Sequence, residues 1–564
     1  MKLVIYQVFT RTFGNKNTNN QPNGTIADNG VGKMSDFNKT TLQQIKKLGV
    51  NTIWYTGIIR HATCTDYSAF GIPCQTPRIV KGKAGSPYAI TDYYDVDPDI
   101  ADNVTKRMNE FEDLVKRTHN ESLKVIIDFI PNHVAREYKS ICKPNGVKDL
   151  GETDDKNKHF DANNNFYYCP NEPLDTSAIP RSINNETTKP DHKSAEYTET
   201  VARCTGNDRF DAHPQANDWY ETIKLNYGID YCDWGGRSNH FNPIPDTWHK
   251  MTDILLFWAA KGIDGFRCDM AEMVPHEFWK YATEKVKAQY PNIVFIGEVY
   301  DPNQYRTYIA AGFDYLYDKV GMYDCLRDVM CEHRSANDIT RQWQATDDIG
   351  KHVLYFLENH DEQRIASNFF CGNMQKGIPA LIVAALFQCN PIMIYAGQEF
   401  GEKGMDGEGF SGIDGRSTIF DYWSIDTIRK GFFERSKLSA EQVQLEKEYR
   451  KILTLCNSEK AISNGKTFDL MYANETNDAF DSNKQFAFLR SSNNTTLLIV
   501  ANFSKTEAHI RVNIPAHAFD YMEIKEGKKN MVDLLSGNHQ SVVLQKNSSI
   551  EIVVPALNGR VYKF

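Results

Sequence analysis

The sequence predicts a parallel (β/α)8 barrel that carries an inserted subdomain after its third strand and is followed by a C-terminal all-β sandwich. Short apolar, β-rich runs alternate with amphipathic helical runs over most of the chain, and eight of these runs are typical of strands. Strands that alternate with helices pair in parallel through crossover connections. Eight such units close into a barrel, and with insertions that fold can exceed about 400 residues.

The predicted strands are apolar or β-branched runs that end where polar loop residues begin. They are 4–10, 51–59, 123–131, 263–269, 293–299, 313–317, 352–358 and 391–396. Amphipathic spacing predicts helices between them, most clearly at 35–50, 107–119, 246–262 and 276–290. An open doubly wound sheet is the alternative fold, but no glycine-rich phosphate turn follows the first strand.

Two changes of pattern predict the domain organisation. Residues 134–245 interrupt the strand–helix alternation and are rich in Asn, Asp, Pro and Tyr, which predicts an irregular, protruding subdomain. Residues 456–564 contain short alternating runs separated by Asn, Ser and Gly, which predicts a β-sandwich. The catalytic barrel is then expected to comprise 1–133 and 246–455.

Composition narrows the class of protein. The chain has 564 residues, 41% of them hydrophobic and 24% charged, with a formal net charge of -9. These values are typical of a globular protein and do not favour nucleic acid or an anionic membrane as a partner. The apolar stretch from Ile378 to Tyr395 is broken by Pro391, so it predicts a buried helix and strand rather than a membrane span.

The N-terminus and the cysteines bear on the cellular compartment in which the protein is expected. The run MKLVIYQVFTRTF is followed by no small-residue cleavage site and is typical of a first strand, so a cytoplasmic location is expected. Export, with a signal removed before this numbering, is the alternative. The 12 cysteines show no CxxC or Cys/His pattern with zinc spacing, which favours reduced thiols and no structural zinc. The only candidates for bridges are the loop cysteines Cys64, Cys74, Cys142, Cys169, Cys204 and Cys232.

Three carboxylates, Asp269, Glu298 and Asp361, lie where predicted strands give way to loops. In a parallel barrel the C-terminal ends of the strands converge on one mouth. Asp269 and Glu298 are separated by one strand–helix–strand step, so adjacent strands would place them side by side. A retaining glycosidase needs two carboxyl groups about 5–5.5 Å apart, one a nucleophile and the other an acid/base.

The neighbours of these acids suggest separate roles. Arg267 precedes Asp269 by two residues and points the same way along a strand, so its charge is expected to keep Asp269 ionised. Glu298 follows the apolar run VFIG, a setting expected to raise its pKa and suit it to donate a proton. Asp361 and His360 are expected to hold sugar hydroxyls and favour a distorted ring.

Four segments resemble the sequence signatures of the alpha-amylase family of glycoside hydrolases. They are DFIPNH (128–133), GFRCD (265–269), GEV (297–299) and ENHD (358–361). The resemblance implies Asp269 as nucleophile, Glu298 as general acid/base and Asp361 as transition-state stabiliser. It also implies that His133, Arg267 and His360 bind the sugar at the cleaved bond. The stretch SPYAITDYYDVDP (86–98) resembles the family segment whose tyrosine stacks under that sugar, which points to Tyr88.

The chain departs from the family pattern after the nucleophile. Family members that hydrolyse polydextrins often carry Lys-His at the third and fourth following positions, where this chain has Glu272 and Met273. That histidine contributes to the family's calcium site, for which Asn132 matches one position and Asn226 offers another. Calcium is the one cofactor that the resemblance suggests. Arg364, in HDEQR, is predicted to be a further sugar ligand.

Three functions remain open on the sequence. The first is a retaining hydrolase of α-glucosidic, mainly α-1,4, bonds in starch-like glucans or maltooligosaccharides. The second is a transglycosylase that uses the same carboxylates and passes the glycosyl group to another sugar. The third is a non-catalytic binding protein on the same scaffold, which the presence of all three carboxylates disfavours.

Overall fold

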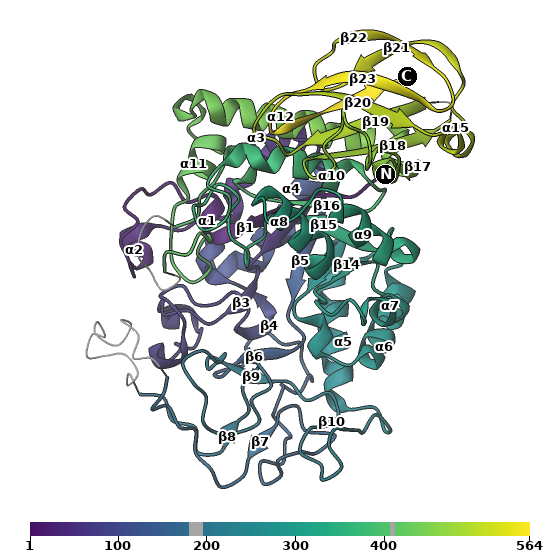
Figure 1. Cartoon of the computed structure of the whole chain (residues 1–564). Coiled ribbons are helices and arrows are strands. Elements are labelled where there is room, and N and C mark those ends of the chain that lie inside the picture. Colours follow the sequence, from purple (N-terminus) through teal and green to yellow (C-terminus); the bar gives the residue numbers. More distant parts are fainter. Residues whose placement is uncertain (180–195, 406–411, 494) are drawn as a thin grey trace.

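The structure is a computed structural model that describes residues 1–179, 196–405, 412–493 and 495–564 (Figure 1). A closed barrel of eight parallel strands forms its centre. In sheet order these are β1 (Val4–Phe9), β16 (Ile392–Tyr395), β15 (Val353–Phe356), β14 (Tyr315–Tyr317), β13 (Val294–Gly297), β12 (Gly265–Cys268), β5 (Lys124–Phe129) and β2 (Thr52–Thr56). Each lies within a predicted strand, so the barrel prediction is confirmed.

Helices follow the barrel strands at the predicted places. They include α3 (Lys39–Lys47), α4 (Arg107–Asn120), α5 (Asp246–Ala259) and α6 (His276–Gln289). The apolar stretch is α10 (Gly377–Leu386), buried along its whole length, followed by the barrel strand β16, as expected. Within the described ranges no helix is both long and apolar enough to cross a membrane.

Side-chain alternation along the barrel strands decides which residues reach the interior. Ile126, Ile296 and Leu354 belong to a cluster that fills the barrel. Val125, which precedes Ile126 on the same strand, packs instead in the larger outer core. Paired residues of adjacent strands share a face. Because Arg267 is paired with Ile296, it also faces inward at the C-terminal end of β12. The same alternation directs the residues that follow β12 and β13 toward the barrel mouth.

The C-terminal domain contains the predicted all-β fold. Its larger sheet has the order β17 (Lys466–Asp469), β18 (Gln485–Ser492), β19 (Thr495–Asn502), β24 (Asn558–Lys563), β21 (Gly527–Asp533) and β22 (His539–Leu544), and β20 (Ala508–Ile514) pairs with β23 (Ser548–Val554). Residue 456, the expected start of this domain, lies inside the helix α12 (Ala440–Ser458), which packs against α10, and the first strand follows at Lys466. In Figure 1 this domain lies at the end of the molecule opposite to the inserted subdomain.

The inserted subdomain is irregular, as the sequence predicts, and part of it (180–195) lies outside the described residues. Its strands form short antiparallel pairs: β6 (His133–Ala135) with β9 (Thr222–Lys224), β7 (Tyr168–Cys169) with β8 (Ala202–Arg203), and β10 (Ile229–Asp230) with β11 (Ser238–Asn239). The chain enters it directly from the end of β5. The subdomain therefore stands over the barrel mouth.

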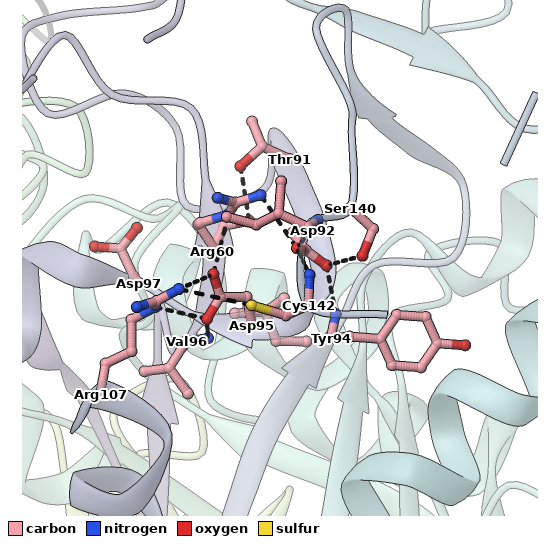
Figure 2. Close-up of polar contacts among 12 residues, drawn as sticks. Arg60, Thr91, Asp92, Tyr94, Asp95, Val96, Asp97, Arg107, Ser140 and Cys142 are labelled. Carbon is pink, nitrogen blue, oxygen red and sulfur yellow. Dashed lines mark hydrogen bonds and ion pairs between the residues drawn. The ribbon is translucent and has the colours of Figure 1, made fainter. Parts of the chain in front are cut away.

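A buried ion-pair cluster fastens the start of this subdomain to the barrel (Figure 2). Arg60, on β3 (Ile59–His61), lies 3.2 Å from Asp92 and 3.4 Å from Asp95, both on β4 (Ile90–Val96). Arg107, at the start of α4, bonds Asp95 with 2.6 and 2.7 Å contacts. Asp92 also accepts hydrogen bonds from the backbone and the hydroxyl of residues 140–142. Two arginines thus neutralise two buried carboxylates in this cluster.

Replacing Arg60 tests how much this cluster stabilises the fold. Arg60→Met keeps the volume but leaves Asp92 and Asp95 with less positive charge inside the protein. Removing one partner of a buried ion pair costs about 3–5 kcal/mol. We therefore expect a clear fall in melting temperature, measured by differential scanning calorimetry.

The control is Lys116→Ala, which removes an exposed pair with Asp113 (side chains 70% and 61% exposed). Such surface pairs contribute about 0–1 kcal/mol. If Arg60→Met melted at the same temperature as Lys116→Ala, the cluster would not stabilise the fold as described.

Candidate active site

The ends of two adjacent barrel strands place Asp269 and Glu298 side by side. Asp269 follows β12 and Glu298 follows β13, and the last residues of these strands, Cys268 and Gly297, are paired. The backbone continues the ladder, since the Glu298 N–H donates to the Cys268 carbonyl at 3.1 Å. The adjacency predicted from one strand–helix–strand step is confirmed.

Arg267 connects the two acids. Its Nη1 lies 2.6 Å from Asp269 Oδ1 and its Nη2 lies 2.7 Å from Glu298 Oε2. A third carboxylate, that of Asp128, lies 3.6 Å from Nη1 and also accepts from Trp54 Nε1 at 3.0 Å. The prediction that Arg267 would pair with Asp269 and so separate the roles of the two acids was incomplete, because the guanidinium forms ion pairs with both acids.

Glu298 differs from Asp269 in the donors that surround it. It accepts from the backbone N–H of Met270 at 2.8 Å and from the hydroxyl of Tyr300 at 2.7 Å. Met270 has φ 42°, in the left-handed region, which is costly for a side chain other than glycine. This turn directs its N–H at Glu298. The two contacts hold the Glu298 carboxyl in one orientation at the barrel mouth.

Burial shifts the acids toward their protonated forms. It raises the pKa of Asp269 and of Glu298, while the positive charge of Arg267 opposes the rise in both. The pKa of Asp361 is also raised, by burial and then by the negative charge of Glu298. The side chain of Asp361 is 40% exposed to the pocket, so water limits this effect. Three neighbouring carboxyl groups that resist full ionisation suit acid and base chemistry near neutral pH.

Gln7, His360 and Tyr88 form a chain of polar contacts beside Asp361. The Tyr88 hydroxyl contacts His360 Nε2, and the two rings stack with centroids 5.2 Å apart. The other imidazole nitrogen, Nδ1, lies 2.8 Å from Gln7 Nε2, and Asp361 Oδ2 lies 3.1 Å from Nε2. Burial holds the pKa of His360 well below its usual value, so the ring is neutral. The Tyr88 hydroxyl, which this neutral ring contacts, lies at the cavity and can bond sugar hydroxyl groups.

A cavity of about 210 Å³ opens onto these residues. Five of the predicted site residues line it, namely Tyr88, His133, Asp269, Glu298 and Asp361. Sequence reasoning did not single out the rest of the lining: Lys81, Ser86, Trp219, Glu221, Thr222, Met270, Tyr300, Ile419 and Phe420. Met270 and Tyr300 directly follow the strand ends that carry the acids, whereas the others come from distant loops and from the short strand β9, which no strand pattern marks. Trp219, Glu221 and Thr222 belong to the inserted subdomain, which therefore walls the cavity.

Three predicted sugar ligands lie behind or away from this lining. Arg267 and His360 lie behind it, in contact with the residues that line the cavity. Arg364 is not brought to the site: it is fully buried, with Nη1 2.8 Å from Glu358 and Nε 2.8 Å from Ser417 Oγ. Its guanidinium also lies 3.9 Å from the Tyr395 ring centroid. Its position therefore gives no support to the prediction that it binds sugar.

The surroundings of Asn132 do not fit a calcium ion. Lys224, paired with His133 across β6 and β9, directs its buried ammonium to Asn132 Oδ1. The same Nζ lies 2.5 Å from Asp208 Oδ1 and 3.2 Å from the Met273 carbonyl. These are the amide, carboxylate and carbonyl oxygens that calcium prefers. The Lys224 ammonium already bonds all three oxygens. A calcium ion would need the same oxygens and would be repelled by the positive charge of this ammonium.

Asn226, the other suggested calcium ligand, is also engaged by the protein. Its side-chain amide donates to the Asp161 and Asn164 carbonyls, both at 2.9 Å. Its oxygen accepts from the Gly228 N–H at 2.8 Å. All three polar contacts of this side chain are thus made within the protein.

Comparison with protein-family models finds two matches along the chain. The model for the alpha amylase catalytic domain matches residues 7–224 and 243–468. The model for the alpha amylase C-terminal all-beta domain matches residues 477–564. Alpha-amylase 3 of Dictyoglomus thermophilum is 22% identical, over 96% of this chain and 93% of that protein. A cyclomaltodextrinase of Thermoanaerobacter pseudethanolicus is 22% identical, over 97% of this chain and 76% of that protein.

Solved structures share the fold at lower identity. A noncanonic maltogenic alpha-amylase from Thermotoga neapolitana has a TM-score of 0.63 at 20% identity, covering 100% of this chain and 98% of that chain. An alpha-amylase from Geobacillus thermoleovorans, solved with acarbose, has a TM-score of 0.63 at 19% identity, again over 100% and 98%. These similarities extend over the barrel, the inserted subdomain and the C-terminal domain.

Two measurements test whether the Lys224 ammonium takes the place of the suggested calcium ion. Adding millimolar Ca²⁺ to the metal-free protein should leave its melting temperature unchanged, because a ligand stabilises only a state that binds it. Lys224→Ala should lower the stability by about 3 kcal/mol, since it leaves buried oxygens unsatisfied and Asp208 without its partner. Both are read from thermal melting curves.

A matched control is Lys158→Ala, which removes a lysine of the same subdomain that is 53% exposed and pairs with Asp155 and Asp161. This change should alter the melting temperature little. Calcium-dependent stabilisation of the unaltered protein would contradict the assignment.

Proposed function

This chain belongs to the alpha-amylase family of glycoside hydrolases, and we propose that it cleaves α-1,4-glucosidic bonds in maltooligosaccharides or starch-like glucans with retention of configuration. The observation that carries the proposal is the sharing of one buried guanidinium, that of Arg267, by Asp269 and Glu298 at the mouth of one cavity. Adjacent strand ends bring two carboxyl groups close together. A retaining mechanism requires a short separation of this kind.

In the first half of the proposed reaction Asp269 is the nucleophile. Its carboxylate attacks the anomeric carbon while the protonated Glu298 donates its proton to the glycosidic oxygen. The bond between the anomeric carbon and the glycosidic oxygen breaks. Arg267 bonds Asp269 Oδ1 and so supports the ionised form that attacks. Burial favours the protonated form of Glu298 at the start. The product of this step is a glycosyl ester of Asp269 and a released sugar.

In the second half Glu298 acts as the base. It removes a proton from a water molecule, whose oxygen attacks the anomeric carbon and displaces the Asp269 carboxylate. Two inversions return the original configuration. Asp361 and Tyr88 line the cavity and are placed to bond sugar hydroxyls during both steps, while His360, behind them, contacts both side chains and positions them.

The substrate class rests on the lining of the cavity and on the relatives. Aromatic side chains such as Trp219, Tyr88 and Phe420 suit the faces of sugar rings, and the carboxyl groups suit their hydroxyls. Similar proteins were solved with acarbose, maltose and maltotriose. An oligosaccharide of α-linked glucose is therefore the proposed substrate.

Asp269→Asn and Glu298→Gln should each reduce turnover of maltoheptaose by at least ~10³-fold, because each removes a group that acts on the reacting atoms. Turnover is measured by chromatography of the products. The control is Asp264→Asn, a change of the same kind in the residue that precedes β12, at the other end of the strand. Near-normal turnover by either active-site variant would refute the assignment.

The products of the unaltered enzyme separate hydrolysis from transfer. Shorter oligosaccharides alone indicate hydrolysis, whereas products longer than maltoheptaose indicate transfer to a second sugar. Freshly released reducing ends should be α anomers, detected by NMR during the first minutes. β anomers would contradict a covalent Asp269 intermediate.

Tyr300→Phe should move the alkaline limb of the pH profile of kcat/KM to higher pH. The Tyr300 hydroxyl bonds Glu298 and holds its pKa down, so its removal raises the pKa of Glu298. Activity needs Glu298 protonated at the start and is lost as pH rises through this pKa. The raised value therefore keeps the enzyme active to higher pH.

The control for this prediction is Tyr281→Phe, whose hydroxyl bonds His249 on the outer helices. It should leave both limbs in place. An alkaline limb of Tyr300→Phe that moved to lower pH would show that Glu298 is not the proton donor.

A further inference from the structure

Four potential metal ligands gather in the inserted subdomain, away from the residues that line the cavity. The donor atoms of His159, Cys169 and Cys204 all lie within 4.8 Å of one another. Cys169 Sγ is 4.0 Å from Cys204 Sγ. A fourth potential ligand, the sulfur of Cys232, lies outside this group of mutually close atoms but is 2.9 Å from His159 Nε2. We propose that these three thiolates and one imidazole form a structural zinc site that braces the wall of the active-site cavity.

The spacing of the sulfur atoms suits a shared metal ion. Zinc in proteins is bound tetrahedrally, with Zn–S distances of about 2.3 Å, so two sulfurs on one zinc lie about 3.8 Å apart. The separation of 4.0 Å between Cys169 and Cys204 is close to this value. Three cysteines and one histidine are a common structural zinc set. Cys232, which is exposed, closes the site toward solvent.

The histidine is already oriented as a zinc ligand. His159 Nδ1 contacts the backbone carbonyl of Tyr168, which leaves Nε2 directed at the sulfurs. A ligating histidine usually donates its other ring N–H to a carbonyl or carboxylate in this way.

A disulfide between Cys169 and Cys204 fits the strand register less well. Cys169 is paired with Ala202 across β7 and β8, so Cys204 is its diagonal neighbour rather than its direct partner. Diagonal neighbours in an antiparallel pair lie about 7–8 Å apart. The Cα atoms of a disulfide usually lie about 4.4–6.8 Å apart. A metal ion spans the longer distance without moving the strands.

Among the described residues, the apolar core beside the site is small. It contains six buried residues, against which Phe160, Tyr197, Phe210 and Tyr231 pack, and its paired strands are two residues long. A metal that joins four separate segments can supply folding energy where the apolar core is small. Between Cys204 and Cys232 in the sequence lie Trp219, Glu221 and Thr222, which line the cavity. The site would therefore hold the cavity wall by its two ends.

Another candidate group, Asp92, Asp95 and Cys142, has different surroundings (Figure 2). Its carboxylates bond Arg60 and Arg107, whose positive charges take the place of a cation. In the described part of the subdomain, no Lys or Arg side chain forms an ion pair or hydrogen bond with the side chains of the four ligands of the proposed zinc site. This contrast favours the Cys/His cluster.

Metal analysis of the purified, untagged full chain tests the proposal. After growth with zinc and dialysis, mass spectrometry should find about one zinc per chain, and the double variant Cys169→Ser/Cys204→Ser should have almost none. The matched control is Cys331→Ser/Cys371→Ser, because this pair has its sulfurs 3.7 Å apart but belongs to no group of three ligands among the described residues. It should retain the zinc.

A milder variant keeps the test valid if the double variant misfolds. Cys232→Ser changes an exposed ligand and should weaken zinc binding at least 10-fold in competition with a chromophoric chelator, while the protein remains folded. In the unaltered protein, removal of zinc should lower the melting temperature, and its return should restore it. Removal should also raise KM for maltoheptaose more than it lowers kcat, because the metal positions the wall and does not touch the reacting atoms.

Several results would overturn the proposal. One is a purified protein without zinc after growth in zinc-supplemented medium. Another is an intact mass two hydrogens lighter, with a Cys169–Cys204 disulfide located by peptide mapping. Zinc that stays bound with unchanged affinity in Cys232→Ser would also refute it. These results leave the proposed glycosidase activity untouched, since that activity depends on Asp269 and Glu298.

Discussion

The buried guanidinium of Arg267 is the interaction on which the site depends. Its side chain has no exposed surface, and burying an isolated charge is strongly unfavourable. Asp269 and Glu298 bond it on two sides, and the rings of Trp54, Tyr88 and Tyr317 lie 5.3–5.6 Å from it. The two carboxylates therefore stabilise the buried cation, and the cation stabilises the ionised form of both carboxyl groups. This mutual requirement fixes the two carboxyl groups before any substrate arrives.

The barrel supplies the geometry for that arrangement. The register of β12 with β13 places Arg267 inward and sets Asp269 beside Glu298. The left-handed turn at Met270 then directs an N–H at Glu298 and fixes that carboxyl. The Asp269 carboxyl is held by Arg267 instead. A rigid scaffold of this kind lowers the reorganisation that the reaction would otherwise require.

A second buried cation, Lys224, connects the inserted subdomain to the barrel. Its ammonium bonds Asn132 just after β5, Asp208 in the subdomain and the carbonyl of Met273 in the loop after Asp269. One lysine thus ties the cavity wall to the loop that carries Asp269. The proposed zinc site would brace the same wall farther out. Access of substrate to the acids then depends on a subdomain that has little regular structure of its own.

The sequence by itself determined the barrel and the main acids, because both are encoded locally. Runs of apolar residues of strand length marked all eight barrel strands, and the polar residues at their ends marked Asp269, Glu298 and Asp361. The expected start of the C-terminal domain, residue 456, lies inside α12, and the first strand of that domain begins at Lys466. The sharing of Arg267 between two acids required the register of two strands.

Only the tertiary structure decided the surroundings of Arg364, Asn132 and the cysteines. Glu358 and Ser417 enclose Arg364, and Lys224 reaches Asn132 from a strand far along the chain. Cys169 and Cys204 are 35 positions apart, and His159 and Cys232 are 73 apart, so no short spacing could reveal the cluster. Local patterns encode strands and helices through periodic burial, whereas the path of an irregular loop follows from contacts between distant residues.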